Sequence, residues 1–343
     1  MPEHDPTEPR EPAGRRSRGR LVLMVVAVLA AVVVGGTLVV AAGSGSGPDS
    51  DSAAGIDGST WPPPRRAADG TSTATASRHI GPQGRVGQFV ATCTRDHSAP
   101  DDPIVYPGLP GRSHLHEFYG AVGVDADTTP ASMLAADTTC DKTADRAAYW
   151  HPTVYDHGEP VEATELDAYY RAAPGVDPAD LEPFPFGLAL IAGDMTFTTP
   201  QPGESVGWTC GVRGALSDEP PVCPESAPLT FVLVFQDCWD GDHLDSEDHR
   251  SHAAYSTNGE CPDGYPVHIP QLTVSVTLPV FGEGHDLSLA SGNVYSLHGD
   301  FFNGWEPDGL AREIDACIRR GVVCNLRNNR DEPTALEERF ADR

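Results

Sequence analysis

The chain has 343 residues, with 23 lysines and arginines against 50 aspartates and glutamates, and a net charge of −27 at pH 7. Residues 1–20 hold five arginines and four acids, which leaves 18 basic and 46 acidic residues in the remainder. This acidic remainder argues against nucleic acid and anionic lipid headgroups as ligands, because both are bound through basic patches. We therefore expect no nucleic-acid partner.

Residues 1–42 predict a membrane anchor. A polar tail, residues 1–20, ends in four arginines from Arg15 to Arg20, and an uncharged run from Leu21 to Ala42 follows. At ~1.5 Å per residue, a helix over this run would span about 33 Å, enough to cross a bilayer core. The arginines predict a single-pass protein of the cell membrane, with residues 1–20 in the cytoplasm and the C-terminal domain outside. A cleaved signal peptide is the alternative.

The rest of the chain divides by composition into three segments. Residues 43–84 are rich in glycine, serine and proline, so we expect a disordered linker. Residues 85–326 have the length and composition of one extracytoplasmic domain with a substantial core. Residues 327–343 are polar and are expected to form a C-terminal tail.

The cysteines indicate a disulfide-stabilised domain. All eight lie beyond the apolar run, and an even number in an exported chain favours disulfide bonds. No Cys-x-x-Cys spacing occurs, which disfavours a structural zinc site. Among the many pairings that eight cysteines allow, we favour near neighbours: Cys93–Cys140, Cys210–Cys223, Cys238–Cys261 and Cys317–Cys324.

The clearest regular elements of the domain are strands. Weaker strands are expected at 84–94, 187–192 and 205–210. The apolar run from Leu229 to Phe235 predicts a central strand, and the alternation from Leu272 to Val280 predicts a half-buried one.

Two short helices complete the expected fold. One is expected near Thr164–Ala172. The second would be capped by Asp308, present Leu310, Ile314, Cys317 and Ile318 on one apolar face, and end at Gly321. Strands joined by long loops indicate a mainly β fold, a β-sandwich or jelly-roll-like single domain, preceded by the transmembrane helix.

Three short segments combine histidine with carboxylates, and they carry the functional prediction. His114 and His116 on a strand would point to one face. In 248–252, a helical turn would bring two histidines together, with Asp248 orienting one ring. We expect these segments to converge with 298–305 on one partly exposed pocket; the alternative is that they only brace loop backbone. The candidate catalytic residues are His114, His116, His249, Arg250, His252, His298 and Asp300.

A divalent metal is the cofactor that this set could hold. Two imidazoles two residues apart on a strand are a common ligand arrangement, and zinc, copper or non-haem iron could each be served. The candidate metal ligands are His114, His116, His249, His252 and His298.

The same residues also suit carbohydrate chemistry without a metal. In a lyase, His249 or His114 would be the base, Arg250 would neutralise the sugar carboxylate, and Tyr119 or Tyr255 would be the acid. In a hydrolase, Asp245, Asp248 and Asp300 could supply paired carboxylates. In a binding module, Trp150, Trp239 and Trp305 would stack on sugar faces. The candidate ligand-binding residues are Tyr119, Trp150, Asp248, Asn303 and Trp305.

Seven segments together resemble a known family. In chain order they are 102–108 (DPIVYPG), 113–120 (SHLHEFYG), 149–155 (YWHPTVY), 238–241 (CWDG), 244–246 (LDS), 248–252 (DHRSH) and 298–305 (HGDFFNGW). Over about residues 85 to 326, their order and spacing resemble the domain of unknown function 1996 family of exported fungal and actinobacterial proteins.

The resemblance implies an exported domain but no defined reaction. Fungal relatives often carry appended carbohydrate-binding modules, which implies work on cell-wall polysaccharide. We therefore expect a membrane-anchored extracytoplasmic domain that is carbohydrate-active, as a lyase, a hydrolase or a polysaccharide-binding domain with a His/Asp site. The alternative is a non-catalytic cell-surface adhesion or metal-binding module.

Overall fold

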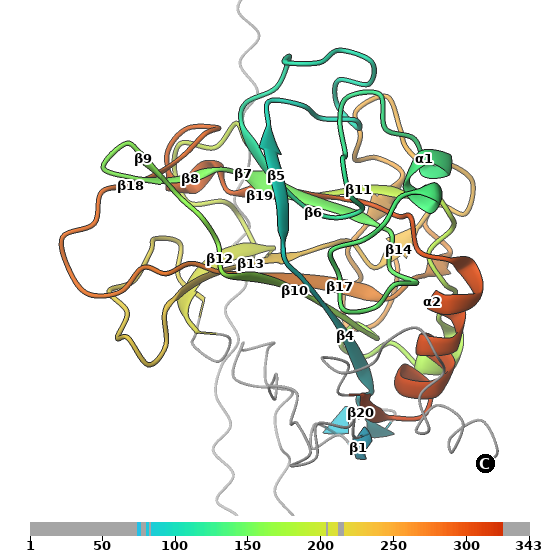
Figure 1. Ribbon diagram of the computed structural model, residues 1–343. Helices are drawn as coiled ribbons and strands as arrows, with labels where there is room; N and C mark the ends of the chain where they lie inside the picture. The colour runs from blue at the N-terminus through green and yellow to red at the C-terminus, as the bar shows by residue number, and fades with distance from the viewer. Residues whose placement is uncertain (1–73, 77–79, 82–83, 204, 212–215, 325–343) are drawn as a thin grey trace, which may run out of the picture. The chain divides into compact units, whose positions relative to one another are not determined.

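The computed structural model describes residues 74–76, 80–81, 84–203, 205–211 and 216–324 (Figure 1). The chain divides into two units, Met1–Ser52 and Ala53–Arg343, and every described residue belongs to the second. The predicted cytoplasmic tail, transmembrane helix and C-terminal tail, and most of the predicted linker, lie outside the described residues. Within the described part of the chain, no helix is long and apolar enough to cross a membrane.

The larger of two main sheets has seven strands in the order β1-β20-β4-β10-β17-β13-β12. Neighbouring strands run antiparallel except for β20 and β4, which run parallel. The strands are β1 (Ala74–Ala76), β4 (Gln88–Cys93), β10 (Glu165–Arg171), β12 (Val206–Cys210), β13 (Leu229–Val234), β17 (Gln271–Thr277) and β20 (Val322–Cys324).

The second main sheet has five antiparallel strands in the order β11-β19-β7-β6-β5. Its three middle strands are buried along nearly their whole length, and this sheet carries the candidate site. The strands are β5 (Arg95–Ala99), β6 (His116–Gly120), β7 (Ala148–Pro152), β11 (Ala189–Gly193) and β19 (His298–Phe302).

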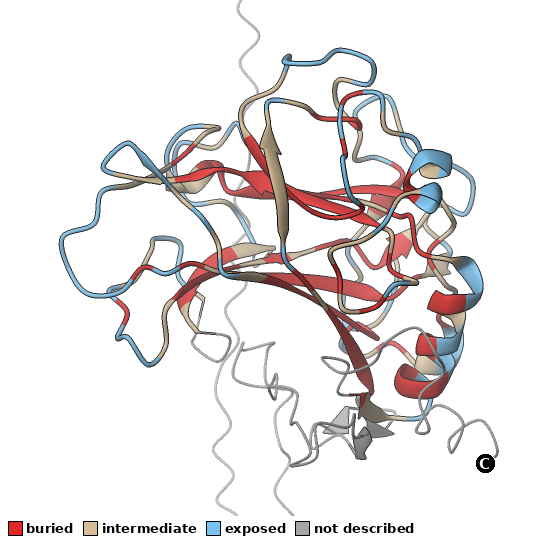
Figure 2. Ribbon diagram, in the orientation of Figure 1, coloured by how far each residue is buried: buried red, intermediate tan, exposed pale blue. Residues whose placement is uncertain are grey.

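The two sheets lie one above the other, with the main core between them (Figures 1 and 2). Phe89 and Tyr170 of the larger sheet stack with ring centroids 4.6 Å apart. Tyr149 and Phe301 of the smaller sheet face the same core, 5.4 Å apart. Because side chains alternate between faces along a strand, the neighbours of Tyr149 and Phe301 must point away from this core, to the outer face of the five-stranded sheet.

Short elements surround the two sheets. Helix α2 (Pro307–Glu313) is followed directly by a π-helical turn, Ile314–Ile318, and Gly321 ends this segment with a φ of 63°. The small strands are β2 (Ile80–Gly81), β3 (Gly84–Arg85), β8 (Val154–Asp156), β9 (Glu159–Val161), β14 (Cys238–Trp239), β15 (Ala253–Ala254), β16 (Val267–His268) and β18 (Leu287–Leu289). The helices are α1 (Pro130–Ala135), α2 (Pro307–Glu313) and the 3₁₀ turns Pro178–Asp180 and Val294–Ser296.

The mainly β architecture with few short helices is confirmed, and every predicted strand is present. The helix predicted near Thr164–Ala172 is wrong, because this segment is strand β10 in the interior of the larger sheet. Leu166, Ala168 and Tyr170 face the core at a spacing of two, which is the period of a strand. The C-terminal helix is present, but it begins at Pro307, with Glu306 rather than Asp308 at the cap position.

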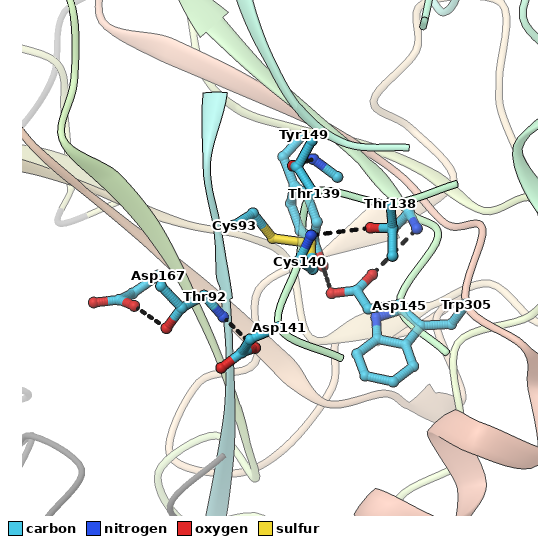
Figure 3. The surroundings of a disulfide bond; sticks show 12 residues. Thr92, Cys93, Thr138, Thr139, Cys140, Asp141, Asp145, Tyr149, Asp167 and Trp305 are labelled. Carbon is cyan, nitrogen blue, oxygen red and sulfur yellow. Dashed lines mark hydrogen bonds between the residues drawn. A yellow bond between two sulfur atoms is a disulfide. The ribbon is translucent and has the colours of Figure 1, made fainter. Parts of the chain in front are cut away.

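All four predicted disulfide pairs are present. Cys93–Cys140 ties the end of β4 to the segment before β7, and Figure 3 shows the polar groups around it. The Thr92 amide donates to the Asp141 carboxylate at 2.9 Å, and the Thr92 hydroxyl donates to Asp167 at 2.5 Å. The disulfide and the Thr92–Asp141 hydrogen bond therefore fasten the segment before β7 to the larger sheet.

Candidate metal centre

The outer face of the five-stranded sheet brings the histidine segments together. In the register, His116 lies opposite Pro152, and continuing the β7–β19 pairing places His298 beside Pro152 on its other side. Two imidazole-bearing positions thus flank a proline across the three strands. Phe118, Trp150 and Asp300 form the next row across the same three strands. His116, His298 and Asp300 therefore share one face, as alternation requires.

His114, His116 and His298 form a compact cluster. The ring centroids of His114 and His116 are 4.2 Å apart. The ring centroid of His298 lies 5.0 Å from that of His114 and 6.0 Å from that of His116. One candidate ligand atom of each residue lies within 4.8 Å of the others. Nitrogens bound to one metal at ~2.0–2.1 Å lie at most ~4.2 Å apart. Small ring rotations would therefore bring all three to a shared ion.

The hydrogen bonds of two rings fix which nitrogen is free. Nδ1 of His116 lies 2.9 Å from the Asp101 carbonyl, and Nδ1 of His298 lies 2.8 Å from the Ser296 carbonyl. A carbonyl can only accept, so each Nδ1 carries the hydrogen and each Nε2 keeps a lone pair. A backbone carbonyl behind a histidine is the usual outer support of a metal ligand.

Two of these nitrogens are buried without a partner. Within the described part of the chain, Nε2 of His114 and Nε2 of His116 have no hydrogen-bond partner. Burial lowers the pKa of His114 to about 4 and that of His298 to about 3, and it holds the pKa of His116 well below its usual value. The three rings are therefore neutral at physiological pH, the form in which imidazole binds a metal.

A carboxyl pair lies beside the histidines. Asp300 is 2% exposed, and its Oδ2 has no partner among the described residues; neither has Nε1 of neighbouring Trp150. Burial raises the pKa of Asp300 well above its usual range, and the nearby charge of Asp102 raises it further. Asp102 accepts the Ile104 and Val105 amides at 3.0 and 2.9 Å, yet burial still raises its pKa to about 6.

The 244–252 segment is attached to β11 but adds no ligand to the three-histidine cluster. Both nitrogens of His252 are engaged, Nε2 with the Ala189 carbonyl at 2.6 Å and Nδ1 with the Ser246 hydroxyl at 2.9 Å. His249 lies 2.9 Å from Asp245 and has a left-handed φ of 57°, so the segment forms turns rather than the expected helical turn. Neither histidine belongs to the three-histidine cluster.

The other two candidates of this segment, Asp248 and Arg250, differ in what their side chains contact. The Asp248 carboxylate accepts the amides of Arg250 and Ser251 and the Ser246 hydroxyl, so it shapes the turn. Arg250 is half-buried, and its charge acts on both His298 and Asp300. A cavity of ≈ 470 Å³ opens on this segment, lined by Asp240, His243, Asp245, Ser246, Glu247, Ser251 and His252.

The remaining ligand-binding candidates are buried. Tyr119 faces the core between the sheets, where its hydroxyl lies 3.2 Å from His151 Nε2. Trp150 is on the outer face but is 1% exposed and packs on Phe118. Asn303 donates to the Pro185 carbonyl, and Trp305 donates to the buried Tyr170 hydroxyl. Since these tryptophans are buried, they offer no surface on which a sugar could stack.

The sequence reasoning missed Asp101 and Asp102. Asp101 supports His116 through its backbone carbonyl, which no residue type could have signalled. Asp102 begins the 102–108 segment on which the family resemblance partly rests. It is the first residue of a turn, where its carboxylate accepts the amides of Ile104 and Val105. The sequence could therefore have predicted Asp102 as a turn residue, but not as a neighbour of Asp300.

Comparison with known proteins gives one match. A family model described as "Domain of unknown function (DUF1996)" matches residues 102–305, more than half of the chain. No curated protein and no solved structure matches the chain. The matched range encloses the three histidines and both buried carboxyls, so the candidate centre lies within the family domain.

Proposed function

Since the chain belongs to the DUF1996 family, whose description assigns no activity, we propose from the site itself that this is a metal-dependent carbohydrate-active enzyme of the cell envelope. His114, His116 and His298 would hold one divalent transition metal, with Asp102 and Asp300 beside it. The substrate would be an envelope polysaccharide, cleaved by hydrolysis or elimination. The domain would stand outside the membrane on the anchor formed by 21–42.

The convergence of three imidazoles carries this proposal. Burying an imidazole nitrogen without a hydrogen bond destabilises the folded protein, and two of the three rings have such a nitrogen within one cluster. A bound cation would satisfy all three lone pairs at once. Three histidine ligands leave coordination positions open, which is the arrangement of catalytic rather than structural zinc sites.

The protein groups around the centre suit bond cleavage. A divalent metal at this position would supply Lewis-acid activation of a ligand oxygen or water. The chain itself supplies Asp300, whose Oδ2 is unpartnered on the same face, and Asp102, which lies within electrostatic reach of it. Two buried carboxyls whose titrations influence each other are the groups expected to accept and return a proton during such a reaction.

The substrate class rests on placement and family. The arginine-flanked apolar run supports an extracytoplasmic domain, and four disulfides suit an oxidising compartment. Polysaccharides are abundant polymers of that compartment, and the appended carbohydrate-binding modules of fungal relatives favour the same class. The acidic surface is consistent with a ligand that is not nucleic acid.

A non-catalytic metal-binding module is the second candidate. The observation that favours it is the depth of the centre, because His116 is fully buried and His298 is 4% exposed. His114 is the half-buried member of the cluster, and the other two histidines are buried. Such a site could retain a metal at the cell surface without turning over any substrate.

Activity on envelope glycans distinguishes the two candidates. The metal-loaded full-length protein should release reducing ends, or unsaturated ends that absorb in the ultraviolet, from isolated cell-envelope polysaccharide. His114→Gln and chelation should each abolish release. His157→Gln is the matched control, since its ring is 63% exposed and outside the cluster, and it should stay active. If the protein binds metal but neither cleaves nor retains any glycan, this result would contradict the enzyme and favour the metal-binding module.

A further inference from the structure

Arg250 is an anomaly in so acidic a protein. Among the residues that the structure describes, its guanidinium takes part in no ion pair and no hydrogen bond, although acids outnumber bases by 50 to 23. Other half-buried arginines are paired: Arg95 with Glu117, and Arg146 with Glu306 at 3.3 Å. A half-buried guanidinium that pairs with no described protein group remains available to a ligand.

The backbone around Arg250 is fixed, so the side chain projects from a defined point. The Arg250 amide donates to the Ser246 hydroxyl and to Asp248, both at 3.0 Å. Two bonds then attach the segment to β11: His252 Nε2 to the Ala189 carbonyl at 2.6 Å, and the Ala189 amide to the Leu244 carbonyl at 2.9 Å.

This attachment sets Arg250 beside the candidate metal centre. Strand β11 is the neighbour of β19, and its residue Ile191 lies opposite Asp300 in the register. The guanidinium charge acts on His298, Asp300 and Asp194, which places it within electrostatic reach of the centre. Asp194 forms no ion pair with it among the described residues, and its Oδ1 accepts the amide and the hydroxyl of Thr196 at 2.8 and 2.7 Å.

We propose that Arg250 is an oxyanion-binding residue, and that the ligand of this site is an acidic polysaccharide whose carboxylate or sulfate ester pairs with the guanidinium. The three-histidine centre would face the sugar next to that charged group. The inference rests on the proposed function for the identity of the ligand as a polysaccharide. It adds a substrate class, anionic rather than neutral, and a residue that selects it.

Physical chemistry supports this choice of ligand. The planar guanidinium fits a carboxylate or sulfate through two parallel hydrogen bonds, and partial burial strengthens such charge-assisted bonds. A neutral polysaccharide would leave the guanidinium desolvated and unpaired, which is unfavourable. The nearby acids Asp102 and Asp194 would repel an anion elsewhere on this face, so binding should depend on the single arginine.

Binding measurements with matched probes test the proposal. The probes are trigalacturonate, its fully methyl-esterified form and a sulfated galactan oligosaccharide, each titrated against the full-length protein by calorimetry. Trigalacturonate or the sulfated probe should bind at least tenfold more tightly than the ester, with the two charged probes distinguishing carboxylate from sulfate. Arg250→Gln should remove that preference, and Arg250→Lys should restore part of it. Arg320→Gln, a change at an exposed arginine in the turn after the C-terminal helical segment, should bind like the wild type.

Measured metal content separates this proposal from the preceding one. Arg250→Gln should keep the metal stoichiometry of the wild type, because Arg250 is not a ligand. Equal affinity of wild type and Arg250→Gln for every charged probe, or failure of both charged probes to bind, would overturn the oxyanion site. Arg250-dependent binding in a protein that takes up no metal would instead sustain the oxyanion site and overturn the metal centre.

Discussion

Asp145 shows how strongly burial can change a single residue. It is fully buried beside the Cys93–Cys140 disulfide, where it accepts the Tyr149 hydroxyl at 2.8 Å and the Ala147 amide at 3.1 Å (Figure 3). Burial is the main cause that raises the pKa of this carboxyl to about 8, and the hydrogen bonds only reduce the rise. Asp145 is therefore protonated in the folded protein at neutral pH.

The protonation of Asp145 predicts a pH-dependent stability. Its folded pKa lies above its unfolded pKa, ~3.9, so folding takes up a proton between these values. Its contribution is fully present below about pH 4 and is lost as pH rises towards 8, at most ~1.4 kcal/mol per pH unit. Asp145→Asn, which mimics the protonated acid, should be less sensitive to pH over this range in denaturant unfolding.

The comparison of Asp145→Asn with wild type isolates this carboxyl from other titrating groups. Asp263→Asn, a change at an exposed aspartate, is the matched control and should follow the wild-type pH dependence. Identical pH dependence for Asp145→Asn and wild type would show that Asp145 is ionised in the folded state, contrary to the account.

At the residue scale, the site could be predicted in part. The spacing of His114 and His116 and the alternation of His298 and Asp300 indicate which side chains share a face once a strand is assumed. The use of both His252 nitrogens in bracing the loop could not be foreseen, because it depends on the Ala189 carbonyl of a strand 63 residues away. Sequence identifies donors; only the fold shows which donors remain free.

At the element scale, strand β10 illustrates the limit of pattern reading. Its residues Glu165–Arg171 include good helix formers, and the acid and arginine at its ends suggest a solvated helix. The segment becomes a strand because β4 and β17 pair with it on both sides over most of its length. Strands such as β13 and β17, with β-branched runs, were predictable because local preference and long-range pairing agree.

A histidine links two elements at the rim of the sandwich. Asp156 at the end of β8 accepts His285 Nδ1 at 2.6 Å and the Asp286 amide at 2.9 Å, while His285 Nε2 donates to the Phe281 carbonyl at 3.0 Å. With both ring nitrogens facing acceptors, the charged imidazolium is favoured. The Phe281 carbonyl and the Asp156 carboxylate accordingly raise the pKa of His285.

The ion pair between His285 and Asp156 should therefore weaken as pH rises. Because the folded pKa of His285 is raised, its stabilisation is fully present below the ordinary value of 6.5 and is lost as pH rises through the folded value. In an NMR titration His285 should titrate above pH 6.5, and Asp156→Asn should lower its midpoint. A midpoint at or below 6.5 in the wild type would contradict the arrangement.

At the scale of the whole molecule, local disulfides fasten a fold made of distant pairings. The bonds close separations of 47, 13, 23 and 7 residues, and these near-neighbour pairs were predictable because each joins adjacent segments. The sheet order was not predictable, since β4 pairs with β10 and β20 from distant parts of the chain. In the five-stranded sheet, β7 lies between β6 and β19, and this order brings the histidines of those two strands onto one face.

The central claim is that this fold assembles a metal centre from His114, His116 and His298. The most direct measurement is the metal content of the full-length protein, determined by elemental analysis after loading with zinc and removal of excess ion. The account predicts one ion per chain in the wild type and in His157→Gln. It predicts loss of that ion in His114→Gln, His116→Gln and His298→Gln. Because His114 is the least buried of the three, His114→Gln should unfold at the same temperature as the metal-free wild type. A wild-type protein without bound metal, or a stoichiometry unchanged in all three variants, would contradict it.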